Sequence, residues 1–117
     1  MKRRVRLRSR REVQRVLRSR RVFAGPTMVA YARPGSEGLR LAVAVSRRVR
    51  GSVGRNRVRR RLRESARAGL LAGDSKADDV GIAYDVVVIA RPAALEAEFA
   101  QLVADMKTIR RRLRQPR

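Results

Sequence analysis

Seven arginines fall between Arg55 and Arg67, and this run holds the residue types most suited to chemistry. A planar guanidinium binds phosphate oxygens through paired hydrogen bonds and stacks on bases. Arginine dominates the cations, because lysine occurs only at Lys2, Lys76 and Lys107. The chemistry indicated is recognition of phosphate groups on a polyanion.

The spacing of this run predicts a helix with two distinct sides. At about 100° per residue, the side that faces a core is formed by Val58, Leu62, Ala66 and Gly69, with Leu70 at its border. A separate stripe, spaced four, three and four residues apart, is formed by Asn56, Arg60, Arg63 and Arg67. Arg57 and Arg61 fall further round, on the solvent side.

The alternative for such a run is a solvated helix face without a ligand. Like charges at i,i+4 destabilise an isolated helix by about 0.2–0.5 kcal/mol per pair. Glu64 is the only acid in the run. A polyanion would relieve this repulsion, so nucleic-acid contact is the preferred interpretation.

The chain contains neither histidine nor cysteine. This excludes Ser-His and Cys-His nucleophile arrangements, disulfides and thiolate zinc sites, and it suits a cytoplasmic protein. Asp78, Asp79 and Asp85 could suggest metal ligands, but acids in a polar loop usually only keep that loop solvated. No apolar run approaches the roughly 20 residues that span a bilayer, so no membrane partner is expected.

The positive charge is concentrated in the first half of the chain. The net charge is +21, and residues 1–67 hold 23 of the 31 Lys and Arg but three of the ten acids. This asymmetry is typical of a nucleic-acid binder. Its aromatic residues are too few for the stacking platform of an RRM-type protein: Phe23, Phe99, Tyr31 and Tyr84.

Local patterns predict a short helix before the first strand. Ser9 followed by Glu12 fits a capping box, and the helix should run to about Ser19. One side of the helix carries Val13, Val16 and Leu17. Another carries Arg11, Arg15 and Arg18. The basic arm at residues 1–8 and the tail at 114–117 are predicted to be flexible.

Three stretches predict the rest of the sheet and its crossover. Residues 27–33 and 39–46 flank turn residues and should form an antiparallel hairpin. Residues 84–90 are typical of a strand covered on both faces, and parallel pairing with an earlier strand would use the arginine helix as crossover. Residues 52–54 could be a short strand or extended lead-in, and 74–81 an acidic loop.

A long helix is predicted from Ala93 onward. With 117 residues, one domain is expected. The predicted fold is an α/β (α+β) two-layer sandwich, a single domain in which about four strands of a mixed sheet are packed by three helices. The oligomeric state is left open.

Several motifs together resemble a known family. Arg55–Arg57 is followed by Arg59–Arg60 and Arg63–Glu64, preceded by Val45–Arg48 and followed by the strand at Tyr84–Arg91. Arg-Asn-Arg alone is a weak signal, whereas its position between a basic strand end and a β-branched strand is specific. From about Leu7 to Leu113, the chain resembles the protein subunit of bacterial ribonuclease P.

The resemblance implies a left-handed crossover, although about 98% of such crossovers are right-handed. It implies a protein that is no catalyst alone. Its partners would be a catalytic RNA subunit and precursor tRNA, whose 5′ leader is hydrolysed with Mg2+ bound mainly by RNA. No organic cofactor is implied.

The resemblance also assigns residues. Those that would contact the RNA subunit are Arg55, Asn56, Arg57, Arg59, Arg60, Arg63 and Arg67. Those that would line a cleft for the single-stranded leader are Val13, Leu17, Tyr31, Arg47 and Arg48. Family members often carry phenylalanine at the first two of these cleft positions. Val13 and Leu17 are aliphatic and cannot stack on bases, so packing in the core is the alternative role for both. For Tyr31, the alternative is an ordinary half-buried position on a strand.

A different class of function remains open from the sequence. A structural ribosomal-type or RNA-chaperone protein would also bind folded RNA, without any processing role. A membrane-active cationic protein is disfavoured, because the arginine helix lacks a broad aromatic or leucine face.

Overall fold

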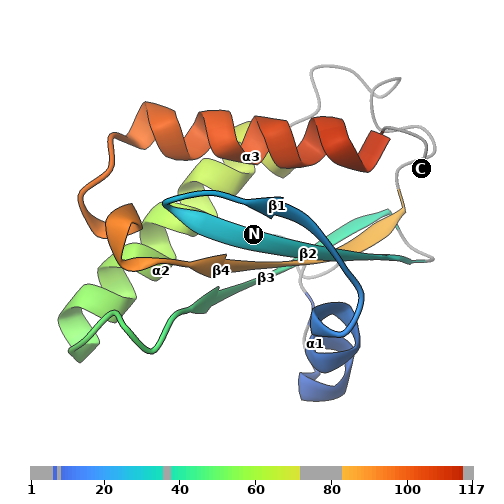
Figure 1. Cartoon of the computed structure of the whole chain (residues 1–117), viewed down its shortest axis with the longest axis horizontal. Coiled ribbons are helices and arrows are strands. Elements are labelled where there is room, and N and C mark those ends of the chain that lie inside the picture. The colour runs from blue at the N-terminus through green and yellow to red at the C-terminus, as the bar shows by residue number, and fades with distance from the viewer. Residues whose placement is uncertain (1–6, 8, 36–37, 72–82, 115–117) are drawn as a thin grey trace.

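A four-stranded mixed sheet forms the centre of the molecule (Figure 1). The computed structural model describes residues 7, 9–35, 38–71 and 83–114. The strands are β1 (Arg20–Ala24), β2 (Met28–Pro34), β3 (Leu39–Val45) and β4 (Tyr84–Ala90), in the order β1-β2-β4-β3. The helices are α1 (Arg10–Leu17), α2 (Ser52–Ala66) and α3 (Phe99–Arg114). The predicted mixed α/β fold is confirmed.

The predicted hairpin between residues 27–33 and 39–46 is wrong. β4 lies between β2 and β3, antiparallel to the first and parallel to the second. The physical reason is that Val86 and Val88 are fully buried on one face of β4 and Val87 on the other. A strand of this kind needs neighbours on both edges and cover on both faces. The parallel crossover through α2 is confirmed, and its left hand stays a prediction.

Three boundaries differ from the sequence patterns. β1 was not predicted, and it pairs antiparallel with β2 at the edge of the sheet. Residues 52–54 form the first turn of α2 and not an extended lead-in. The helix predicted from Ala93 begins at Phe99, after a short 3-10 turn at Pro92–Leu95.

Some predicted segments lie outside the described residues, namely most of the basic arm, the acidic loop at 74–81 and the tail from 115. Leu7 is the described part of the arm. Its side chain is buried, and its amide donates to the carbonyl of Leu41 on β3 at 2.9 Å.

The main core lies between the sheet and the layer formed by α2 and α3. The predicted apolar side of the arginine helix is confirmed, because it is buried in that core through Val58, Leu62, Ala66, Gly69 and Leu70. The last two belong to η2 (Arg67–Leu71), a π-helical turn that continues α2.

Helix α1 lies on the opposite face of the sheet, near one end (Figure 1). A second, smaller core joins Leu7, Val16 and Val87 there. The predicted capping box is present: Glu12 N donates to Ser9 Oγ at 3.0 Å, and Ser9 N donates to the Glu12 carboxylate. Because α1 has only eight residues, it covers part of this face and leaves the rest open.

Candidate nucleic-acid interface

The outer side of α2 carries a shallow groove of about 290 Å3 lined by side chains of the predicted stripe. The lining residues are Asn56, Arg59, Arg60, Arg63, Glu64 and Arg67. The apolar side of the helix faces the core, so these side chains are turned to solvent. The sequence thus predicted correctly that the stripe forms one surface.

Within this groove the cations differ in what they already bind. Arg59 Nη1 donates to Asn56 Oδ1 at 3.1 Å, which orients both side chains. Arg60 and Arg67 are exposed, and their guanidinium groups make no hydrogen bond or ion pair with any described residue. Guanidinium groups of this kind are available for phosphate oxygens.

Arg55 is turned inward, although it begins the Arg-Asn-Arg motif. Its guanidinium donates to the carbonyls of Ser46, Val49 and Val45, at 2.9, 3.1 and 3.2 Å. The side chain is half-buried. Arg55 therefore holds the end of β3 and the loop after it, and RNA contact by this residue stays a prediction.

The solvent-side placement of Arg57 and Arg61 is only half correct. Arg57 is exposed. Arg61 instead donates from Nη2 to the carbonyl of Ala97, and its Nε is buried. The cause is that the turn between β4 and α3 passes beside α2, so this guanidinium ties the helix to that turn.

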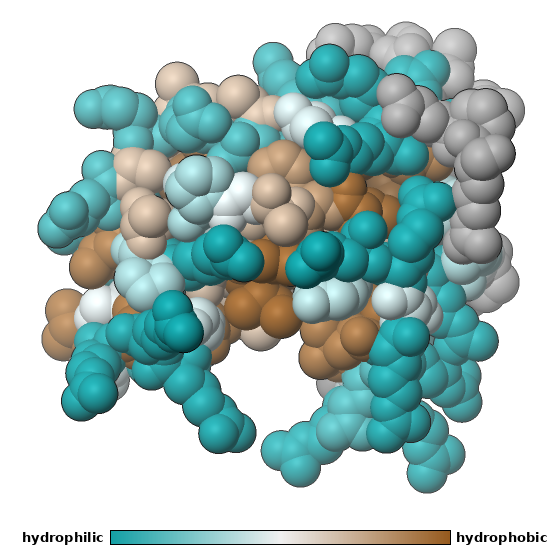
Figure 2. Space-filling view, in the orientation of Figure 1, coloured by the Kyte–Doolittle hydropathy of each residue, from teal (hydrophilic) through white to brown (hydrophobic). Residues whose placement is uncertain are grey.

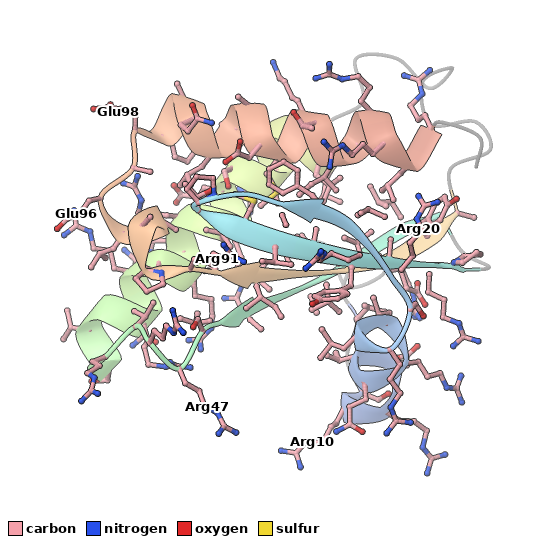
Figure 3. All side chains as sticks on the ribbon, viewed as in Figure 1. Arg10, Arg20, Arg47, Arg91, Glu96 and Glu98 are labelled. Atoms are coloured by element: carbon pink, nitrogen blue, oxygen red, sulfur yellow. The ribbon has the colours of Figure 1, made fainter. Side chains whose placement is uncertain are left out.

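A separate hollow lies between α1 and the segment that leads into α2. Figure 2 shows a notch in the lower edge of the molecule, with hydrophobic surface at its top and hydrophilic side chains on both sides. Arg10 of α1 and Arg47 of the loop after β3 flank this notch (Figure 3). Arg48, the neighbour of Arg47, is also exposed, and its amide donates to Ser46 Oγ at 3.2 Å.

The predicted apolar cleft residues differ in their exposure. Val13 and Tyr31 are half-buried and pack against the small core beneath α1. Leu17 is 36% exposed. Val13 thus has the packing role that was the alternative, whereas Leu17 is available to a ligand. Leader contact by any of them stays a prediction.

Sequence reasoning missed Arg40, which fixes α1 to the sheet. Its Nε donates to Asp85 Oδ1 at 3.0 Å, its Nη2 donates to Asp85 Oδ2 at 3.2 Å, and Nη2 also donates to the Glu12 carboxylate. The hydrogen bond from Arg40 holds the pKa of Glu12 below its ordinary value. The hydrogen bonds that Arg40 donates to Asp85 and, second, to Glu12 raise the pKa of Arg40. The one available signal was a charge inside an otherwise apolar strand.

Two of the described acids are bound by other side chains of the fold. Asp85 is engaged by Arg40, and Asp105 accepts from Thr27 and Gln101. Within the described part of the chain, no three acidic, histidine or cysteine side chains lie together as metal ligands. Asp78 and Asp79 lie outside that part.

The fold and the arginine-lined groove together are typical of one class, a small α/β protein with a cationic surface suited to nucleic acid. The family model described as ribonuclease P matches residues 1–114. The chain belongs to the ribonuclease P protein family. Its described residues include no helix long and apolar enough to cross a membrane.

Relatives and solved structures agree with this assignment. The ribonuclease P protein component of Chloroflexus aurantiacus is 37% identical over 116 residues, which is 95% of this chain and 78% of the relative. That of Acidothermus cellulolyticus is 37% identical over 118 residues, covering 96% and 90%. The RNase P protein from Thermotoga maritima shares the fold, with a TM-score of 0.69 at 22% identity over 91% of this chain and 96% of that one.

Proposed function

We propose that this chain binds the catalytic RNA of ribonuclease P through the α2 groove and holds the 5′ leader of precursor tRNA in the hollow beside α1. As a member of the family, it is a subunit of an endoribonuclease that matures tRNA 5′ ends. The observation that carries the proposal is the groove itself, where the exposed guanidinium groups of Arg60 and Arg67 bind no residue that the structure describes.

The protein acts by neutralising phosphates and not by bond making. Each phosphate contact releases counterions, so binding weakens steeply with salt. Histidine and cysteine, the usual acid-base and thiol groups, are absent from the chain. The RNA subunit is therefore the catalyst in this proposal, and Mg2+ supplies charge stabilisation at RNA phosphates. The holoenzyme works in the cytoplasm.

In the hollow, charge does more than stacking. Arg47 and Arg48 attract the leader backbone from one side and Arg10 from the other. Leu17 offers apolar contact, but it cannot stack on a base as an aromatic ring does. Leader binding by this chain is thus mainly electrostatic, and the ring of Tyr31, which packs against the small core beneath α1, could add aromatic contact.

The test is reconstitution of leader cleavage. A ribonuclease P RNA is incubated with precursor tRNA at low Mg2+, with and without the protein. The proposal expects the protein to restore cleavage, and Arg60→Gln/Arg67→Gln to restore it less than Lys107→Gln/Arg111→Gln, which removes the same charge from exposed positions on α3. Binding without rescue would instead support the structural or RNA-chaperone role.

A further inference from the structure

The outward side of α1 carries a second set of exposed cations, separate from the α2 groove. Arg11 and Arg15 lie one turn apart on α1, and Arg18 is its C-cap. All three side chains are exposed, and their guanidinium groups make no hydrogen bond or ion pair with any described residue. They point away from Val13 and Val16, which face the sheet.

Helix stability does not explain these arginines. Arg11 lies in the first turn of α1, where the helix macrodipole disfavours a cation. Arg11 and Arg15 are four residues apart, a spacing at which like charges repel. A helix of eight residues is also too short to be stable alone.

Two devices hold this helix in place despite its charge. The capping box of Ser9 and Glu12 starts it, and Arg40 binds the same Glu12 from the sheet. Because Glu12 and Arg11 are adjacent in the helix, the bond to Arg40 also fixes the rotation that turns Arg11 and Arg15 outward.

A recess of about 300 Å3 opens beside this bridge and is bordered by Arg15 and Arg33. Its two acids, Glu12 and Asp85, are both engaged by Arg40. Arg15 and Arg33 therefore give the recess a net positive charge, which is suited to phosphate groups.

We propose that the outward face of α1 (Arg11, Arg15 and Arg18), together with Arg33 of β2 across the recess, binds a second backbone segment of the partner RNA subunit, distinct from the segment on the α2 groove. The inference rests on the proposed function for its RNA partner. α1 and α2 lie on opposite faces of the sheet (Figure 1), so one protein would bridge two RNA segments. A leader held between α1 and the β3 loop lies on another side of α1, so the RNA subunit is the occupant.

Charge complementarity can be tested with a matched pair of double variants. Arg11→Gln/Arg15→Gln and Lys107→Gln/Arg111→Gln each remove two exposed cations that lie four residues apart on a helix and whose charged groups bind no described residue. The logarithm of the binding constant falls with the logarithm of the salt concentration, with a slope of about 0.7–0.9 per phosphate contact. Loss of two contacts in the α1 variant should therefore make this slope shallower by about 1.4–1.8 for binding to the RNA subunit. Between 50 and 200 mM salt this corresponds to about tenfold less loss of affinity than for the wild type. The α3 variant should keep the wild-type slope, and equal slopes for both variants would overturn the proposal.

Because the chain has no cysteine, single cysteines can carry a tethered iron-EDTA cleavage reagent. The sites are Gln14→Cys on the outward side of α1, Glu64→Cys in the α2 groove and Ala104→Cys on exposed α3. We expect the first two to cut different segments of the RNA subunit and the third to cut neither. A shared segment, no cutting from α1, or cutting only of the precursor leader would overturn the inference. If the α1 inference is overturned in this way but the protein still restores leader cleavage, the proposed function stands and only the role of α1 is wrong.

Discussion

Arg55 Nη1 lies 2.9 Å from the carbonyl oxygen of Ser46, so the first arginine of the Arg-Asn-Arg motif binds the protein backbone at the end of β3. The same guanidinium also satisfies the carbonyls of Val45 and Val49. These three acceptors lie at the end of β3 and in the basic loop that borders the hollow. Within the motif, Arg55 therefore stabilises the fold, whereas Asn56 and Arg57 are exposed to solvent.

Arg55→Ala should destabilise the fold. The change leaves three carbonyl groups without a charged donor, which costs on the order of 1–3 kcal/mol. Urea unfolding measures this loss. Arg57→Ala, at an exposed position of the same helix, should change the free energy of unfolding by no more than about 0.5 kcal/mol. Equal effects from the two variants would show that the inward contacts of Arg55 contribute little.

Two glycines of the same helical segment should respond to alanine with opposite signs. A Cβ at Gly69 would lie 2.7 Å from the carbonyl oxygen of Val103 and 2.9 Å from the Cβ of Met106. Gly69→Ala should therefore cost about 1–3 kcal/mol through overpacking. A Cβ at Gly54 meets only a Val49 methyl at 4.0 Å, so Gly54→Ala should gain up to about 1 kcal/mol in helix propensity. Thermal unfolding of both variants checks the signs, and a stabilised Gly69→Ala protein would contradict the close packing of η2 on α3.

The bond between Arg40 and Glu12 should make stability depend on pH. Arg40 lowers the pKa of Glu12 in the folded protein below the unfolded value of about 4.3. The stabilisation is complete above the unfolded pKa and is lost as pH falls through the folded pKa. Thermal unfolding between pH 7 and 3 should therefore show a smaller acid-induced drop in Tm for Glu12→Gln than for the wild type. Glu96→Gln, an exposed acid, should keep the wild-type drop.

Thr27 and Asp105 form a buried polar contact between the bend that precedes β2 and helix α3. Thr27 Oγ1 donates to Asp105 Oδ2 at 2.6 Å, and Gln101 donates to the other oxygen at 2.9 Å. Thr27→Val keeps the shape but leaves a buried carboxylate oxygen without its donor, at a cost of about 1–3 kcal/mol. Thr108→Val on the same helix removes a hydroxyl that only bonds the Ala104 carbonyl within α3, so it should change little. Chemical denaturation compares the two, and a neutral Thr27→Val would show that the contact contributes nothing net.

The arginine helix could be read from the sequence because its signals are local. The spacing of Val58 and Leu62 fixed the buried side, and the stripe on the outer side followed from helical geometry alone. The capping box of Ser9 and Glu12 is likewise a contact between near neighbours. The family resemblance then supplied the class of partner.

The features that the sequence did not reveal depend on contacts between distant segments. Helical geometry alone places Arg61 on the solvent side. In the structure its guanidinium donates to the carbonyl of Ala97, which lies 36 residues further along the chain, in the turn before α3. Arg40 meets Glu12 and Asp85, which are 28 and 45 residues away. The hairpin error has the same origin, because no local pattern shows that β4 inserts between β2 and β3.

The most direct test of the account is the salt dependence of binding between the protein and ribonuclease P RNA, measured for the wild type and for Arg60→Gln/Arg67→Gln. If the α2 groove grips the RNA backbone, the variant should unfold at the wild-type temperature and its salt slope should fall by about 1.4–1.8. An unchanged slope with unchanged folding would contradict the central claim that this groove is the RNA interface.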